Sequence, residues 1–303
     1  MCPVEPVSAS WIASVRAVDC TRVTRGSSSV VWRVTSHEIT VAHSTVQRRT
    51  KTLMLVFAVA VLPRILLAQR ETHTNTNGWF VFNADVAINE KWAVLFDASA
   101  RRSGTFDEAM ANFVRGGLAY EITDNVRAAI GANWSRTYPY GELPSDYPVT
   151  ERRIWEQLQL SHEIGRLDLS HRYRLEQRFR GRRDDPDVDL IDYWERSSRF
   201  RYQVKGTLPL SGDAIEQGEA YLSLANELFV GIGRNVQRNI FDQNRATFSV
   251  GYRLTRNWRT EVGFLEHVIF KSNGTDVERN HTVTFTLSYS RPHLRPVGVT
   301  PSR

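Results

Sequence analysis

The sequence predicts an all-β fold, a transmembrane antiparallel up-and-down β-barrel of the bacterial outer membrane. Three observations favour it: apolar and polar residues alternate along many segments, short and long connections alternate between these segments, and an apolar leader with basic residues precedes them. Many of the segments are about ten residues long or longer. A strand of about 9 to 11 residues crosses a bilayer at a tilt, whereas strands of soluble proteins average about 5 to 6.

The segment 167–180, LDLSHRYRLEQRFR, shows the alternation most clearly. Leu169 and Tyr173 fall on one face of a strand, and Arg172 and Arg174 fall on the other. A helix, at about 100° per residue, would mix the two sets, so the period of two indicates a strand. An apolar face toward lipid and a charged face toward a lumen would satisfy both halves of the pattern.

The same period recurs along the chain. In WFVFNADVAI, Phe80 and Phe82 fall on one face, and Asn83 and Asp85 fall on the other. The predicted strands are 79–88, 92–101, 113–122, 126–135, 152–164, 167–180, 194–205, 219–229, 245–254, 258–268 and 280–289.

The connections between these strands differ in length. The tight ones are 89–91, 123–125, 165–166 and 255–257, and the long polar ones are 102–112, 136–151, 181–193, 230–244 and 269–279. Short periplasmic turns and long external loops are typical of outer-membrane barrels. Trp92 and Trp258 each begin a strand just after a tight turn, where an interfacial aromatic girdle is expected.

The number of strands needs a further argument. Single-chain bacterial barrels have an even number of strands, and the pattern identifies eleven. We therefore expect twelve strands, with ten as the alternative. The missing strand would fall in the long connection 206–218 or in the polar lead 69–78.

The N-terminal part has a different organisation. Arg48, Arg49 and Lys51 precede an apolar run, and Ala68 ends a plausible cleavage site, so we interpret 46–68 as a signal peptide. Residues 1–45 show no sustained pattern. We hypothesise that translation starts at Val46 from a GTG codon and that 1–45 is not translated. The alternative is a disordered N-terminal extension, and the predicted barrel domain is 69–303.

Removing the leader changes the charge balance. Residues 1–68 hold 8 of the 39 Lys and Arg and 3 of the 33 Asp and Glu, which leaves 31 basic and 30 acidic side chains. The net charge of +6 therefore does not indicate a nucleic-acid partner. Both cysteines, Cys2 and Cys20, lie in the removed part, so the barrel would form no disulfide.

A soluble lipocalin-like barrel or sandwich is the alternative fold. Its apolar face would point inward and its polar face would contact water. The repeated arginine and glutamate residues on one face, the strand lengths and the alternating loop lengths favour the membrane barrel.

The luminal face would carry a dense set of charges. As a luminal charge network or anion track we assign Arg172, Arg174, Glu176, Arg178, Arg180, Arg199, Arg201, Glu227, Arg245 and Arg253. One interpretation is a salt-bridged network that fills a narrow barrel, because buried charges need partners. The other is a track for anionic solutes, as in pores lined by arginine or lysine rings.

Several motifs together resemble the DUF2490 family of bacterial exported proteins. The most distinctive are R-x-R-L-E-Q-R at 172–178, N-E at 226–227 and D-Q-N-R at 242–245. The resemblance covers about residues 78–290. It implies an outer-membrane barrel and supplies no activity.

Motifs for catalysis or metal binding are weak. In Ser161-His162 and Ser170-His171, adjacent strand residues point to opposite faces, so neither pair forms a nucleophile and base in contact. The aspartates of RRDDPDVDLID lack the glycine and glutamate of an EF-hand. We therefore expect no enzymatic activity, no cofactor and no metal site.

Two functional classes remain open from the sequence. One is a narrow channel for small anionic solutes lined by arginines. The other is a non-conducting structural or interaction barrel with a salt-bridged lumen and partner-binding external loops. The expected surroundings are the lipid bilayer and lipopolysaccharide.

Overall fold

The computed structural model describes residues 16–24, 30–38 and 70–291, apart from 105, 234–235 and 237–239. The chain divides into two compact units, 1–68 and 69–303. In the first unit, β1 (Arg16–Thr24) and β2 (Val30–Glu38) pair as an antiparallel hairpin. The signal-peptide segment 46–68 lies outside the described residues, so the leader and the translation start stay predictions.

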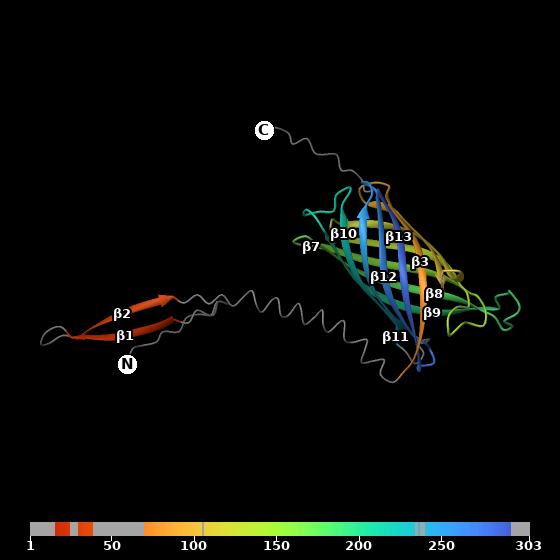
Figure 1. The fold of residues 1–303 in the computed structure, drawn as a ribbon, viewed down its shortest axis with the longest axis horizontal. Coiled ribbons are helices and arrows are strands. Elements are labelled where there is room, and N and C mark those ends of the chain that lie inside the picture. Colours follow the sequence, from red (N-terminus) through yellow and green to blue (C-terminus); the bar gives the residue numbers. More distant parts are fainter. Residues whose placement is uncertain are drawn as a thin grey trace, which may run out of the picture. The chain divides into compact units, whose positions relative to one another are not determined.

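The second unit contains a closed barrel of eleven strands (Figure 1). They are β3 (Glu71–Ala87), β4 (Trp92–Ser103), β5 (Glu108–Thr123), β6 (Val126–Thr137), β7 (Val149–Ile164), β8 (Leu167–Arg182), β9 (Tyr193–Pro209), β10 (Ala220–Ile232), β11 (Phe241–Arg253), β12 (Trp258–Phe270) and β13 (Asp276–Arg291). Each segment expected from the sequence overlaps one of them. The all-β barrel is therefore confirmed, with eleven strands where we expected twelve. The described residues include no helix long and apolar enough to span a bilayer.

The seam that closes the barrel explains the odd number. Neighbouring strands pair antiparallel around the barrel, but β13 pairs with β3 in parallel, with Asp276 opposite Glu71 and Arg291 opposite Val86. An odd number of alternating strands leaves the first and last strands pointing the same way. Residues 71–78 do not form an extra strand but lengthen β3, and 206–209 lengthen β9.

The two ends of the barrel differ in how their strands connect. Tight turns follow β3, β5, β7 and β11, and side chains accept main-chain hydrogen bonds in several of them. Asn89 Oδ1 accepts hydrogen bonds from the main-chain nitrogens of Lys91 and Trp92, and Thr255 Oγ1 accepts one from Trp258. The connections after β4, β6, β8, β10 and β12 lie at the opposite end, the long-loop end. The chain enters the barrel at the long-loop end and leaves β13 at the tight-turn end.

The outer face of the barrel carries many large apolar side chains. The strand residues Leu224, Ile130 and Leu118 point away from the lumen, and their exposed fractions are 62%, 54% and 47%. The predicted girdle residues also lie beside the tight turns, and each packs on a tyrosine. Trp92 and Tyr120 have ring centroids 4.9 Å apart, and so do Trp258 and Tyr289.

The inner face is mostly polar and contains two apolar clusters, one around Trp155 and one formed by Trp79, Met110 and Leu265. Trp155 on β7 is 1% exposed and packs against Ala93, Ala119 and Ala129. Gly131 completes this wall: a Cβ there would lie 2.1 Å from the carbonyl oxygen of Gly116 and 2.4 Å from Cζ2 of Trp155. The indole can lie against β5 and β6 only because their inward residues are small.

Candidate functional site

The site lies in the lumen and begins with the register of β8 and β9. Glu176 on β8 is paired with Arg199 on β9, and Arg174 is paired with Arg201. Because side chains alternate along each strand, all four of these residues point inward. Each is less than a tenth exposed.

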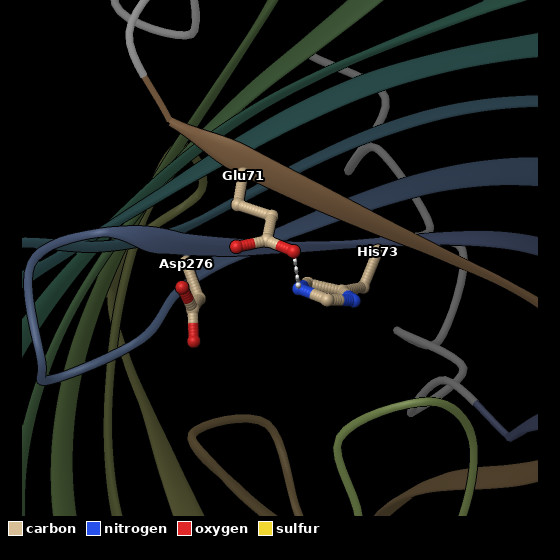
Figure 2. Close-up of side chains that lie close together, drawn as sticks. All are labelled: Glu71, His73 and Asp276. Atoms are coloured by element: carbon tan, nitrogen blue, oxygen red, sulfur yellow. Dashed lines mark ion pairs between the residues drawn. The ribbon is translucent and has the colours of Figure 1, made fainter.

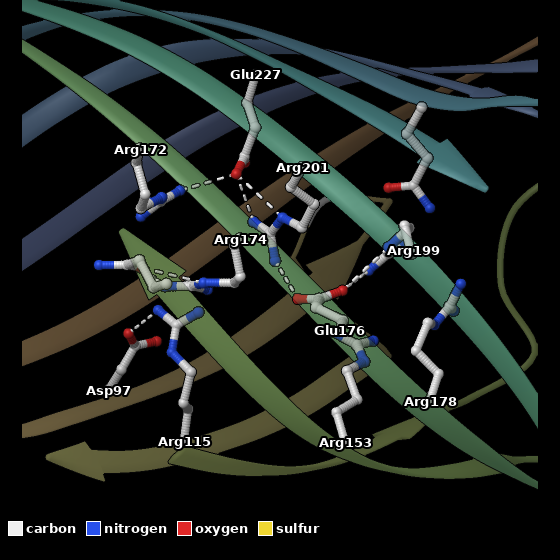
Figure 3. Close-up of polar contacts among 12 residues, drawn as sticks. Asp97, Arg115, Arg153, Arg172, Arg174, Glu176, Arg178, Arg199, Arg201 and Glu227 are labelled. Carbon is white, nitrogen blue, oxygen red and sulfur yellow. Dashed lines mark hydrogen bonds and ion pairs between the residues drawn. The ribbon is translucent and has the colours of Figure 1, made fainter. Parts of the chain in front are cut away.

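Two buried carboxylates organise the centre of the lumen (Figure 3). Glu176 accepts hydrogen bonds from Arg199 Nη2 and Arg201 Nη1, each at 2.6 Å. Glu227 on β10 accepts bonds from Arg201 Nη2 at 2.7 Å and from Arg172 Nη2 at 2.8 Å. Arg201 therefore joins the two carboxylates, and this central network links three successive strands.

A second network surrounds Glu151 at the start of β7. Its carboxylate accepts bonds from Arg153 Nε at 2.5 Å, Arg178 Nε at 2.6 Å and Arg180 Nε at 3.3 Å. Asp242 joins the two networks, since it lies 2.8 Å from Arg199 and 3.7 Å from Arg178. The sequence pattern did not identify either carboxylate as a luminal residue.

The predicted luminal residues do not all belong together. Arg253 lies beside a tight-turn connection and donates to the carbonyl oxygens of Ile215 and Arg256. Arg253 therefore does not belong to the luminal charge network, to which the sequence pattern had assigned it. Among the residues that the structure describes, Arg174 forms no ion pair: it donates to Gln157 Oε1 at 3.1 Å and lies over the Trp155 ring at 4.7 Å.

A cavity of about 610 Å³ lies beside these networks. Its lining contains ten arginines and Lys271 against four carboxylates. The connection between β6 and β7, residues 138–148, contributes Tyr138, Tyr140 and Leu143 to the lining, so the cavity lies at the long-loop end. Glu176, Glu195 and Asp242 pair with lining arginines from outside the lining, so eleven basic side chains outnumber seven carboxylates. This excess of positive charge favours an anionic occupant.

The 138–148 connection is anchored to β3 and β13, the two strands that form the seam of the barrel. Tyr140 donates to Glu278 on β13 at 2.5 Å, and the main-chain nitrogen of Glu142 donates to Asn75 on β3 at 3.1 Å. Burial and the neighbouring Glu278 hold the pKa of Tyr140 well above its ordinary value, so its hydroxyl keeps its proton. The connection thus reaches inward over the cavity.

One group of possible metal ligands lies near this connection (Figure 2). Glu71, His73 and Asp276 bring ligand atoms within 4.8 Å of one another at the seam between β3 and β13. His73 is already engaged, because Nε2 lies 3.8 Å from Glu71 and Nδ1 lies 3.2 Å from Glu142. Both ring nitrogens of His73 therefore already face a carboxylate.

The histidines beside the sequence's serines face outward. His162 and His171 stack with their ring centroids 5.5 Å apart, and His171 Nδ1 lies 2.9 Å from the hydroxyl of Tyr202. Ser161 and Ser170 are paired on the neighbouring, inward-facing positions of the same strands. Neither serine therefore forms a nucleophile–base pair with its adjacent histidine.

Comparison with known proteins adds a family. The family model described as "Protein of unknown function (DUF2490)" matches residues 76–278, which run from β3 into β13 and cover most of the barrel. No curated protein and no solved structure matches the chain.

Proposed function

The chain belongs to the DUF2490 family, whose description assigns no activity, and from its geometry we propose an outer-membrane barrel that admits small anionic solutes to an arginine-lined lumen. The observation that carries this proposal is the cavity lining, in which eleven basic side chains face four carboxylates. Arginine or lysine rings give anion preference in known pores.

The distribution of apolar surface supports placement in a membrane. A soluble barrel of the lipocalin type hides its apolar face inside and presents a polar face to water. Here large apolar side chains such as Phe96, Leu118 and Ile130 are exposed on the outside, whereas charged residues such as Glu176 are buried inside. Transmembrane barrels show this reversed arrangement.

A second candidate function also has a specific observation in its favour. Arg201 joins Glu176 and Glu227 in the middle of the lumen, and the 138–148 connection reaches over the cavity. An ion-paired network of this kind can fill a narrow barrel. The alternative is therefore a non-conducting barrel that acts through its external connections.

The first experiment is fractionation followed by conductance. The full chain, expressed with its own leader, should be recovered from the outer-membrane fraction as a heat-modifiable protein. In a planar bilayer with a salt gradient, it should give a steady conductance whose reversal potential indicates anion preference. A folded barrel without conductance would support the non-conducting alternative, and a chain absent from the membrane fraction would remove both.

A pair of opposite variants tests the origin of the selectivity. Arg182 lines the cavity and binds Glu195 through Nε at 2.8 Å, and both side chains are one-third exposed. Arg182→Gln should reduce anion preference and Glu195→Gln should increase it. Equal shifts in the same direction would indicate altered packing instead of charge.

A further inference from the structure

Two cavity arginines stand apart from the ion-pair networks. Arg101 on β4 lies over the indole of Trp79 with Cζ 3.8 Å from the ring centroid, and Arg245 on β11 lies 5.1 Å from the same centroid. Trp79 itself is 5% exposed on β3 and packs edge-on against His267. Residues from four strands thus meet around one indole ring.

The partners of the other cavity arginines make this pair distinct. Each of the remaining eight is ion-paired, as follows: Arg115 with Asp97; Arg153, Arg178 and Arg180 with Glu151; Arg172 and Arg201 with Glu227; Arg182 with Glu195; and Arg199 with Glu176. Among the described residues, no carboxylate lies within ion-pair distance of Arg101 or Arg245.

Arg101, Arg245 and Trp79 also carry buried N–H donors that no described residue accepts from. In the described part of the chain, the Nε atoms of Arg101 and Arg245 and the Nε1 atom of Trp79 are buried without a hydrogen-bond partner. Leaving a buried donor unpaired costs free energy, and most such groups in folded proteins have a partner. Three unpaired donors around one ring indicate a place for a ligand that supplies acceptor atoms and negative charge.

From these contacts we propose that Arg101, Arg245 and Trp79 form a binding site for a small oxyanion, that is, a solute carrying a carboxylate or phosphate group. The planar guanidinium presents paired N–H donors that match either group. The cavity, about 610 Å³, is within the size range of small-molecule sites. This site deepens the proposed function by naming the class of solute that the lumen holds.

Cation–π contacts provide the competing explanation. Arg245 also lies 4.8 Å from the Phe229 ring, so both arginines could serve only to pack the lumen. The two explanations differ in what removal of the charge does. A packing role predicts lower stability and no effect on anion binding, whereas a binding site predicts weaker binding.

The test is calorimetric titration of the purified full chain with inorganic phosphate, and separately with acetate, at constant ionic strength set with chloride. We expect saturable binding of at least one of these anions. Arg101→Gln and Arg245→Gln should each weaken it at least tenfold, because each removes a charge-assisted hydrogen bond. The matched control is Arg182→Gln, which removes the same charge from the same cavity and should change affinity less than threefold.

Thermal unfolding provides a second readout. Without added anion, Arg101→Gln and Arg245→Gln should leave the midpoint unchanged or raise it, because each removes a positive charge that has no counterion. Saturating phosphate or acetate, whichever binds, should raise the midpoint of the unmodified protein and not that of the double variant. If a glutamine variant does not fold, the lysine variant at that position keeps the charge, loses the planar fork and should still bind more weakly.

Three results would overturn the site: no saturable heat with either anion, an equal loss of affinity in Arg182→Gln, or destabilised variants with unchanged affinity. The outcome is separable from that of the channel. A barrel that binds phosphate or acetate without conducting would keep the site and remove the channel, whereas anion-selective conductance without saturable binding would do the reverse.

Discussion

Arg199 donates a 2.8 Å hydrogen bond to Asp242, a residue that the strand ladder skips. Phe229 pairs with Gln243 and Val230 pairs with Phe241, so Asp242 is the extra residue of a β-bulge between β10 and β11. A bulge re-aims a side chain. By strict alternation Asp242 would share the outer face with Asn244, but its carboxylate instead reaches the luminal arginines.

Replacing this carboxylate tests what the bulge contributes. Asp242→Asn should lower the free energy of unfolding by about 1–3 kcal/mol. The loss should stay below the roughly 3–5 kcal/mol typical of breaking an isolated buried pair, because Arg199 keeps Glu176 and Arg178 keeps Glu151. Urea unfolding followed by tryptophan fluorescence measures it.

The control for that measurement is Asp187→Asn, which removes an exposed carboxylate from the connection after β8. Its effect should stay within about 0.5 kcal/mol. Equal effects of the two changes would mean that Asp242 has no special role in the lumen.

Alternation along a strand was sufficient to predict which side most luminal residues face. Glu176 and Arg199 were assigned inward from the period of two alone, and each is less than a tenth exposed. Asp242 was missed because a bulge breaks the period. Trp79 falls inside a predicted strand, but no local pattern shows that Arg101 and Arg245 meet on its ring. Such contacts depend on which strands lie close across the barrel.

The predicted number of strands differs from the observed number for a different reason. Eleven segments carry the pattern, and the twelfth was inferred from the rule that single-chain bacterial barrels have an even number of strands. An even number lets every neighbouring pair, including the closing one, be antiparallel. The parallel pairing of Glu71 with Asp276 removes that requirement. The long connection between β6 and β7 was predicted as 136–151, but its inward course was not, because its contacts with Asn75 and Glu278 are remote in sequence.

The small residues that pack against Trp155 lead to a prediction about folding. Gly131→Ala should prevent assembly of the heat-modifiable barrel, because the new Cβ would lie 2.1 Å from a main-chain oxygen that cannot move aside. The matched change is Gly116→Ala, whose Cβ would meet only the Leu95 oxygen, at 4.0 Å, and should leave assembly normal. Normal assembly of both variants would show that the wall tolerates a larger residue.

The parallel seam predicts that the two ends of the barrel chain lie on opposite sides of the membrane. If the long connections face outward, an epitope inserted before Glu71 should bind antibody on intact cells. One inserted after Arg291 should bind only after permeabilisation. A third epitope between Asp185 and Pro186 reports the long-loop end independently. Reaction of the first two epitopes under the same condition would contradict the odd number of strands.

The outer face gives the clearest test of lipid contact. Leu224→Arg replaces an outward side chain that is 62% exposed on β10. In water such a change is nearly neutral, within about 0.5 kcal/mol. Against lipid it should cost roughly 2–4 kcal/mol near the middle of the bilayer. The matched control is Leu190→Arg, since Leu190 is 61% exposed in the connection after β8 and should tolerate arginine. Urea unfolding in lipid vesicles compares the two, and equal stabilities would place the outer face in water and not in lipid.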